Sequence, residues 1–169
     1  MKGQFAVTLL GACLIAGCHD YGRLYPVQGP LAAMAPPPVY TAKITLVPDW
    51  SKPITVGNSA YNKAGKISVV LANGEQLNGT WKEVYDKAGT DATAANPLAA
   101  AWDAVYGQGY YTAHVLGTPL LVHTELTGPL GTVLTVEWYE RQYGTGDNAR
   151  LIDQGVAKDN RGNVYKLAF

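Results

Sequence analysis

The chain has 169 residues, with 13 basic side chains, 13 acidic side chains and two cysteines. That length suits a single domain with its own hydrophobic core. A charge balance this close to neutral gives no electrostatic footprint for nucleic acid, so we expect no nucleic-acid partner.

Residues 1–17 have the three parts of an export signal. Lys2 supplies the positive region, an apolar stretch runs from Phe5 to Ile15, and small residues precede Cys18. The apolar stretch is shorter than the roughly 20 residues that a membrane-spanning helix requires. Leu14–Cys18, with the sequence Leu-Ile-Ala-Gly-Cys, resembles the lipobox of bacterial lipoproteins. The alternative is an ordinary secretory signal that happens to contain a cysteine.

The resemblance implies that Cys18 carries a diacylglyceryl group and becomes the first, acylated residue of the mature protein. Removal of residues 1–17 would leave 152 residues, with 12 basic against 13 acidic side chains, because Lys2 is the only charge lost. The sequence shows no polybasic cluster, so the acyl chains are expected to hold the protein at the membrane. In such lipoproteins an Asp directly after the cysteine favours the inner membrane. Here that residue is His19, followed by Asp20, which indicates the outer membrane.

The remaining cysteine, Cys13, would be lost with the signal and the sulfur of Cys18 would be alkylated. No thiol would then remain for a disulfide, a metal thiolate or a catalytic nucleophile. The mature domain must therefore be stabilised by packing alone.

Residues 18–40 contain five of the ten prolines. Proline-rich sequence favours extended conformations, so we expect a tether between the lipid and a domain at residues 41–169. The alternative is a segment laid along the domain surface by its aromatic residues, among them Tyr21, Tyr25 and Tyr40.

Beyond Tyr40, short β-prone runs alternate with Gly, Asn, Asp and Pro, which indicates an all-β domain. The first half predicts strands at 41–47, 66–71 and 75–81, with a weaker one at 54–56. A three-residue loop at 72–74 with a left-handed Gly74 would pair Val69 with Leu77. Residues 86–96 are expected to form a loop.

One helix is predicted to start at Pro97, to be capped by Asn96 and to end at Gly107. Strands are predicted at 110–116, 121–127, 132–139, 152–158 and 163–169. A four-residue loop at 159–162 would pair Val156 with Tyr165. About eight strands and one short helix indicate a small barrel or a two-layer sandwich.

Two histidines are weak candidates for a metal site. If residues 110–127 formed a hairpin, His114 would lie opposite His123, with Glu125 on the same face. Because no third and fourth ligands are identified, we expect no metal and no cofactor.

Catalytic motifs are not found. Asp103, Glu125, Glu137 and Glu140 have no spacing that brackets a substrate bond. None of the serines that follow Cys18 lies in a Gly-x-Ser-x-Gly setting, so we do not expect an enzyme. Four aromatic residues near the helix end, Trp102, Tyr106, Tyr110 and Tyr111, form a candidate binding patch, or else they cover the core.

The expected function is therefore that of a lipid-anchored outer-membrane lipoprotein whose domain faces the periplasm and binds an envelope protein. One alternative is an inhibitor of an envelope-degrading enzyme such as lysozyme, by analogy with other small lipidated barrels. Gly162, Tyr165, Leu167 and Phe169 also resemble the terminal signal of outer-membrane barrels. An integral barrel is the less favoured alternative, because the predicted strands fall short of the 9–11 residues that cross a membrane.

Overall fold

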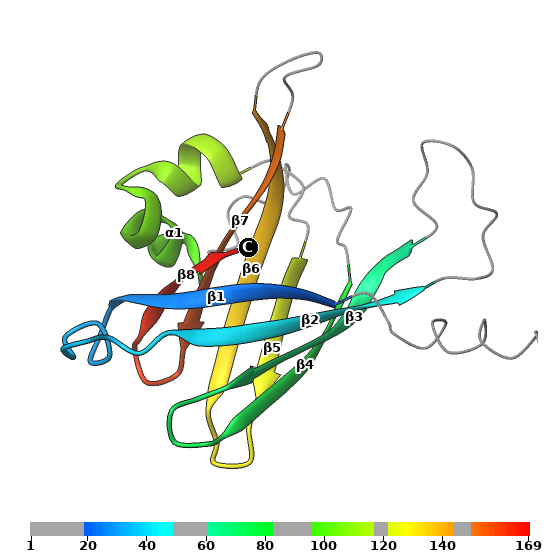
Figure 1. Cartoon of the computed structure of the whole chain (residues 1–169). Helices are drawn as coiled ribbons and strands as arrows, with labels where there is room; N and C mark the ends of the chain where they lie inside the picture. The colour runs from blue at the N-terminus through cyan, green and yellow to red at the C-terminus, as the bar shows by residue number, and fades with distance from the viewer. Residues whose placement is uncertain (1–18, 49–60, 83–95, 117–121, 144–149) are drawn as a thin grey trace, which may run out of the picture.

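The computed structural model describes residues 19–48, 61–82, 96–116, 122–143 and 150–169. Its strands follow one another round a closed antiparallel barrel, in which β8 returns to pair with β1 (Figure 1). They are β1 (His19–Gln28), β2 (Tyr40–Pro48), β3 (Tyr61–Val70), β4 (Gln76–Lys82), β5 (Val122–Thr127), β6 (Val133–Tyr143), β7 (Arg150–Asp159) and β8 (Val164–Ala168). The predicted all-β fold is confirmed, in its barrel form.

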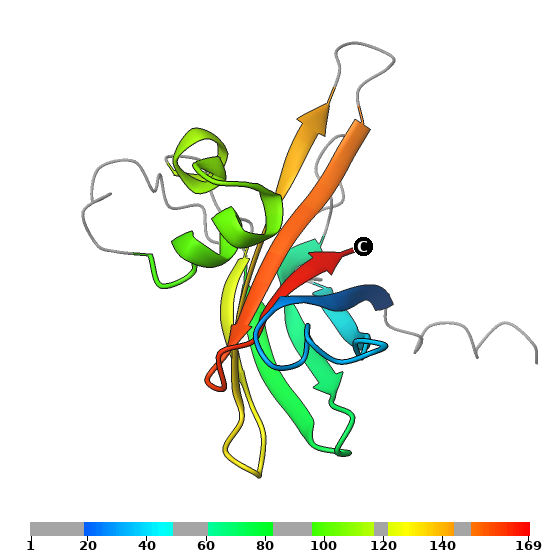
Figure 2. The same ribbon diagram turned by 90° about the vertical axis from the view of Figure 1, so that its left-hand side faces the viewer.

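Two short helical segments cover one side of the barrel wall (Figure 2). The α-helix α1 (Ala99–Tyr106) lies against β7 and β8, and the π-helix η1 (Tyr111–Val115) follows it. Gly107 ends α1 with φ +111° and donates its N–H to the Asp103 carbonyl, as the sequence predicts. The helix begins at Ala99 rather than Pro97, because Asn96 first closes a turn by accepting the Leu98 N–H at 2.7 Å.

The interior of the barrel is filled by alternate residues of the strands. On β6, Leu134, Val136 and Trp138 point inward, and Trp138 meets Trp81 edge-on with 5.7 Å between ring centroids. Because alternate residues of a strand point to opposite sides, one face of each strand builds this core. Its buried members are Leu24, Tyr40, Ala42, Ile44, Ile67, Val69, Leu77, Trp81, Val122, Leu126, Leu134, Val136, Trp138, Ala157, Tyr165 and Leu167.

A second core lies outside the barrel wall, beneath the helices. Tyr139, Val156 and Val164 point outward from β6, β7 and β8, and Trp102 of α1 packs among them. The buried residues of this second core are Leu98, Ala101, Trp102, Val115, Tyr139, Val156 and Val164. On β6, both the inward residues of the core and the outward Glu137 and Tyr139 are therefore buried.

The prediction of a tether at residues 18–40 is wrong, because most of this segment belongs to the barrel. His19–Gln28 forms β1, which pairs with β2 (Tyr21↔Lys43) and with β8 (Tyr25↔Lys166). Pro26 is accommodated because the register with β8 shifts between Pro26 and Gln28. Residues 29–39 are the loop between β1 and β2. The barrel therefore starts at residue 19 rather than residue 41.

The strand predicted at 110–116 is also wrong, since this segment is helical. Asp103 explains the difference: its carboxylate accepts the N–H of Gly109 at 3.0 Å and that of Tyr111 at 2.8 Å. These bonds satisfy free N–H groups at the start of a new helical turn, as an N-cap does. The other predicted strand regions hold strands β2 to β8, which differ in length from the prediction. The weak strand at 54–56 and most of the loop at 86–96 lie outside the described residues.

The two hairpin predictions have different outcomes. The first is confirmed, because Gly74 has φ +81° and Val69 pairs with Leu77. The second is off by one residue: Tyr165 pairs with Ala157, and Val156 with Lys166. The loop has three residues, 160–162, because the N–H of Asp159 donates to the Asn163 carbonyl at 3.0 Å. Asp159 and Tyr165 therefore point inward, and Val156 points toward the helix.

Candidate functional site

Three of the four residues of the predicted aromatic patch form one stack, and Tyr111 packs separately against the second core. The rings of Trp102, Tyr106 and Tyr110 stack, with centroids 5.5 Å apart for Trp102–Tyr106 and 4.7 Å for Tyr106–Tyr110. Trp102 is fully buried, whereas Tyr106, Tyr110 and Tyr111 are half-buried. The Tyr106 hydroxyl donates to the Gly155 carbonyl at 3.3 Å, and that of Tyr110 donates to Gln154 at 2.7 Å. These bonds direct both polar edges to the barrel wall, so the stack fixes the helices to the barrel.

Beneath the stack, Glu137 is a buried carboxylate with three side-chain donors. It is 1% exposed and accepts the Trp102 indole N–H at 2.8 Å and the Asn96 amide at 3.1 Å. Its third partner is His123 on β5, whose Nδ1 lies 2.7 Å from Glu137 Oε1. A buried carboxylate requires such partners to offset its lost hydration. The cluster thus joins β5, β6 and the start of α1.

The His123 side chain is 43% exposed. Its pKa is raised above the ordinary value of 6.5, chiefly by the hydrogen bond to Glu137. Partial burial lowers this pKa, and the negative charges of Glu137 and Glu125 raise it further. A carboxylate that holds Nδ1 leaves Nε2 free to exchange protons, as in general-base sites. Within the described residues, the hydrogen bonds of His123 include none to a hydroxyl or a thiol. In the described part of the chain, the pair therefore consists of a base and its orienting carboxylate, with no nucleophile hydrogen-bonded to it.

The predicted pairing of His114 with His123 does not form. His114 lies in η1 with its ring 4.7 Å from that of Tyr110, and His123 pairs across the sheet with Glu137. In the described part of the chain, no three His, Cys, Asp or Glu side chains are grouped to hold a metal ion. The metal hypothesis thus loses the geometry on which it depended.

At one end of the barrel the four loops β1–β2, β3–β4, β5–β6 and β7–β8 meet, and we call this the four-loop end (Figure 1). Three of the loops share one design. Each has three residues ending in a glycine of positive φ: Gly74 at +81°, Gly131 at +79° and Gly162 at +87°. Only glycine adopts this conformation without strain, so the three hairpin tips have a defined shape.

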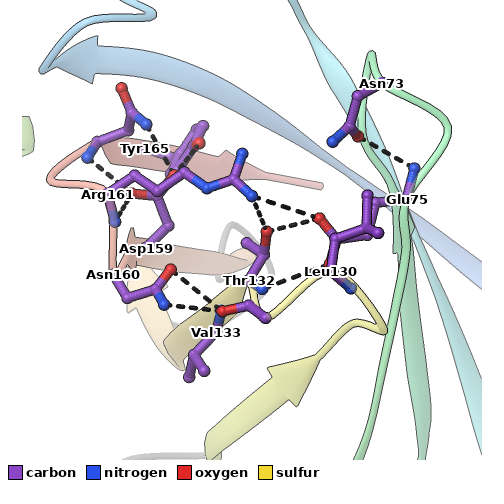
Figure 3. Close-up of polar contacts among 11 residues, drawn as sticks. Asn73, Glu75, Leu130, Thr132, Val133, Asp159, Asn160, Arg161 and Tyr165 are labelled. Carbon is purple, nitrogen blue, oxygen red and sulfur yellow. Dashed lines mark hydrogen bonds and ion pairs between the residues drawn. The ribbon is translucent and has the colours of Figure 1, made fainter.

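A polar network connects these loops (Figure 3). Glu75 is 3% exposed and accepts the Thr132 hydroxyl at 2.6 Å and the Leu130 N–H at 2.9 Å. Arg161 Nη2 donates to the same hydroxyl at 2.7 Å and lies 3.6 Å from Glu75 Oε2. These contacts, led by the Thr132 hydroxyl, lower the pKa of Glu75 despite its burial. The network therefore favours the ionised form of Glu75.

Asp159 holds the last loop in a similar way. It accepts the N–H groups of Arg161 at 2.9 Å and Asn163 at 2.8 Å, and the Tyr165 hydroxyl at 2.8 Å. The pKa of Tyr165 is raised, chiefly by burial and next by this carboxylate. Asn163 in turn accepts the Leu31 N–H at 2.9 Å, which joins the β1–β2 loop to the network.

The loops enclose a half-open cleft of about 320 Å³. Arg161 is the one cation among its lining residues, and its side chain is 51% exposed. The lining comprises Pro30, Leu31, Tyr40, Leu71, Ala72, Asn73, Thr132, Asp159, Arg161, Asn163 and Tyr165. Sequence reasoning missed this site, because its residues come from four loops and only the Asn-Gly and Arg-Gly turn signals marked them.

Comparisons of the chain with protein-family models, curated proteins and solved structures give no match. Among the described helices, none is long and apolar enough to cross a membrane. The functional argument therefore depends on the sequence and on the geometry of the barrel.

Proposed function

We propose that the protein is a lipid-anchored lipoprotein of the outer membrane, facing the periplasm, and that its barrel acts by binding at the four-loop end rather than by catalysis. The lipobox at Leu14–Cys18 supports the anchor. The observation that supports the binding role is the cleft of about 320 Å³ at the end of the barrel opposite His19, the residue after Cys18.

The position of β1 determines how far the four-loop end would lie from the lipid anchor. Since β1 begins at His19, a lipid on Cys18 would be joined to the barrel with no spacer. Ten residues of strand at about 3.3 Å each separate that point from the four-loop end, a distance of roughly 33 Å along the strand. The cleft therefore lies far from the attachment point and is accessible to a periplasmic partner.

The four-loop end also exposes apolar side chains. Met34 of the β1–β2 loop and Leu130 of the β5–β6 loop are 52% and 65% exposed, and Val70 at the end of β3 is 57% exposed. Apolar residues around a cleft, on tips of defined shape, are typical of a protein contact site. A preorganised surface also loses less conformational entropy on binding.

The anchor and the contact site are tested separately. Mass spectrometry of the native protein is expected to show a mature chain that starts at a diacylglyceryl-modified Cys18. For the contact site, a photoreactive amino acid at Leu130 is expected to give one defined cross-linked product in intact envelopes. The same probe at Ala104, an exposed residue of α1, is the control. Equal cross-linking at both positions would contradict binding at the four-loop end.

Inhibition of an envelope-degrading enzyme such as lysozyme is a narrower form of the same proposal. The Gly-closed hairpin tips at the four-loop end support it, because a rigid projecting loop can enter an enzyme cleft. A lysozyme assay with the unlipidated chain and its Leu130→Asp variant tests this form. No inhibition at micromolar excess would contradict it.

The integral-barrel alternative is tested by the distribution of side chains. Several strands are longer than predicted, and β1, β3, β6 and β7 reach 10 or 11 residues. However, the described barrel interior is packed with apolar residues, while Arg23, Lys43 and Lys66 face outward. Membrane barrels have the reverse arrangement, so we do not adopt this alternative.

A further inference from the structure

Basic residues that are far apart in the sequence lie together on the outer wall of the barrel. Arg23 of β1, Lys43 of β2 and Lys66 of β3 are all exposed, on three strands that are neighbours in the sheet. Lys82 of β4 and Lys166 of β8 border this area. We call the outward residues Tyr21, Arg23, Tyr25, Lys43, Lys66, Lys82 and Lys166 the basic face.

Two exposed tyrosines lie within the basic face. Tyr21 is 58% exposed and pairs across the strands with Lys43, and Tyr25 is 40% exposed and pairs with Lys166. Directly paired residues have Cβ atoms about 5 Å apart, so the two tyrosines and the two lysines are neighbours on this wall. The Lys166 ammonium itself lies over the Tyr106 ring of α1, 5.6 Å from its centroid. Arg23 lies between the two tyrosines on β1, which spreads the three side chains over roughly 13 Å.

No carboxylate opposes these charges on the described outward face of β8, β1, β2, β3 and β4. The acidic side chain within these strands, Asp20, has the parity of the inward-pointing Leu24 and lies at the rim. Arg23, Lys43 and Lys66 make no ion pair with any described residue. The face is therefore a continuous region of positive charge on a nearly neutral protein.

We propose that the basic face lies on the anionic phospholipid headgroups of the bilayer that holds the anchor. This inference rests on the lipid anchor of the proposed function, because Tyr21 and Arg23 are three and five residues from Cys18. Lysine and arginine are attracted to anionic headgroups, and tyrosine favours the membrane–water interface. The helix α1 contacts β7, β8 and the adjoining β1, where it borders the basic face at Lys166, and it lies away from β2 and β3 (Figure 2). Tyr21, Arg23, Lys43 and Lys66 remain exposed.

The consequence is a barrel that lies on its side. The acyl chains hold the start of β1 at the membrane, and the basic face holds the wall along β1, β2 and β3. The four-loop end then projects laterally, with its cleft open to the periplasm. A second attachment of this kind strengthens membrane binding and also fixes orientation, which an acyl chain alone does not.

The first test uses the chain from residue 18 with Cys18→Ser, so that no lipid contributes. Co-sedimentation with phosphatidylcholine vesicles containing 30 mol% phosphatidylglycerol is expected at low salt, and is expected to be lost at about 1 M salt. Lys43→Glu should weaken this binding about fivefold or more. Lys158→Glu is the matched control, because it makes the same charge change at an exposed position of β7 and should have little effect. Equal binding to neutral vesicles, or an equal loss with Lys158→Glu, would overturn the proposal.

The second test uses the lipidated protein on the same vesicles. Hydroxyl-radical footprinting should show Tyr21 and Tyr25 protected relative to detergent solution, with Met34 of the four-loop end unchanged. Protection of Met34 in their place would reject the orientation. If Cys18 proves unmodified while Lys43→Glu still weakens vesicle binding, the anchor fails and the basic face stands. If Lys43→Glu leaves vesicle binding unchanged but abolishes a cross-link to an acidic envelope protein, the basic face belongs to a protein contact and the lipid proposal fails.

Discussion

On β6 the outward residues Glu137 and Tyr139 are buried beneath α1, whereas on β1 the outward Tyr21 and Tyr25 are 58% and 40% exposed. Both strands have the same alternation, and both contribute inward residues to one core. The difference arises from what covers the wall. The β6–β7 side has a second apolar layer and a satisfied carboxylate, while β2 and β3 on the other side have separated cations and lie away from α1. The outward residues of the β6–β7 side therefore contribute to the stability of the fold, whereas those of the β1–β3 side are accessible to a partner.

From this comparison we expect the largest loss of stability when Trp102, beneath the helices, is replaced. Trp102→Ala should reduce the free energy of unfolding by about 3–5 kcal/mol, because it leaves a cavity and removes a donor from Glu137. Urea denaturation of the unlipidated chain measures it. Tyr21→Ala on the uncovered side is the control, and should change this free energy by no more than about 0.5 kcal/mol. Similar losses for the two variants would invalidate the contrast.

A smaller effect is expected when only the charge beneath the helix is removed. Glu137→Gln should destabilise the protein by about 1.5–3 kcal/mol, since it weakens charge-assisted bonds in a buried site. It should also lower the pKa of His123, which NMR titration of the imidazole can follow. Glu125→Gln removes an exposed charge from neighbouring β5 and should cost little stability. An unchanged His123 pKa in Glu137→Gln would show that the pair does not form in solution.

The His123–Glu137 pair also predicts a pH dependence. Because the folded-state pKa of His123 is raised above 6.5, its contribution is complete below pH 6.5 and is lost as the pH rises through the folded value. Unfolding midpoints should therefore decrease as the pH increases through this range. Replacement of His123 by Ala should abolish that part of the slope. A slope of opposite sign in the native protein would refute this account.

The smallest stability effect is expected on the basic face. Lys43→Gln removes an exposed cation that makes no ion pair with a described residue, so its free energy of unfolding should remain within about 0.5 kcal/mol. Chemical denaturation provides the measurement. A loss above about 1 kcal/mol would mean that the basic face also stabilises the fold. It would contradict the proposed contrast between the two sides of the barrel.

Local signals predicted much of the fold. The β3–β4 hairpin, including the Val69↔Leu77 register, follows from the Asn73-Gly74 turn and the apolar alternation. The register of the last hairpin differed because the Asp159 side chain, rather than the turn sequence, selects a three-residue loop. The prolines concealed β1, since its assignment depends on pairing with β8 at the far end of the chain.

The candidate sites were less predictable, because they are made by residues distant in sequence. Glu137 lies 41 residues from Asn96 and 35 from Trp102, and no spacing rule connects them. The four-loop cleft draws on four separate turns. The basic face is the clearest case: the sequence has no polybasic cluster, but adjacent strands bring single cations together. The order of strands in the barrel, and not the composition of the chain, determines that these cations lie together.

The pairing of β1 with β8 has a consequence for the maturation of the protein. Leu24 has no β8 partner until Leu167 has been synthesised, so the barrel cannot close on an incomplete chain. The seam joins the earliest and latest strands to emerge, which makes closure a late and slow event. In the lipid-anchored protein that we propose, β1 would be held at the membrane while it waits for its β8 partner.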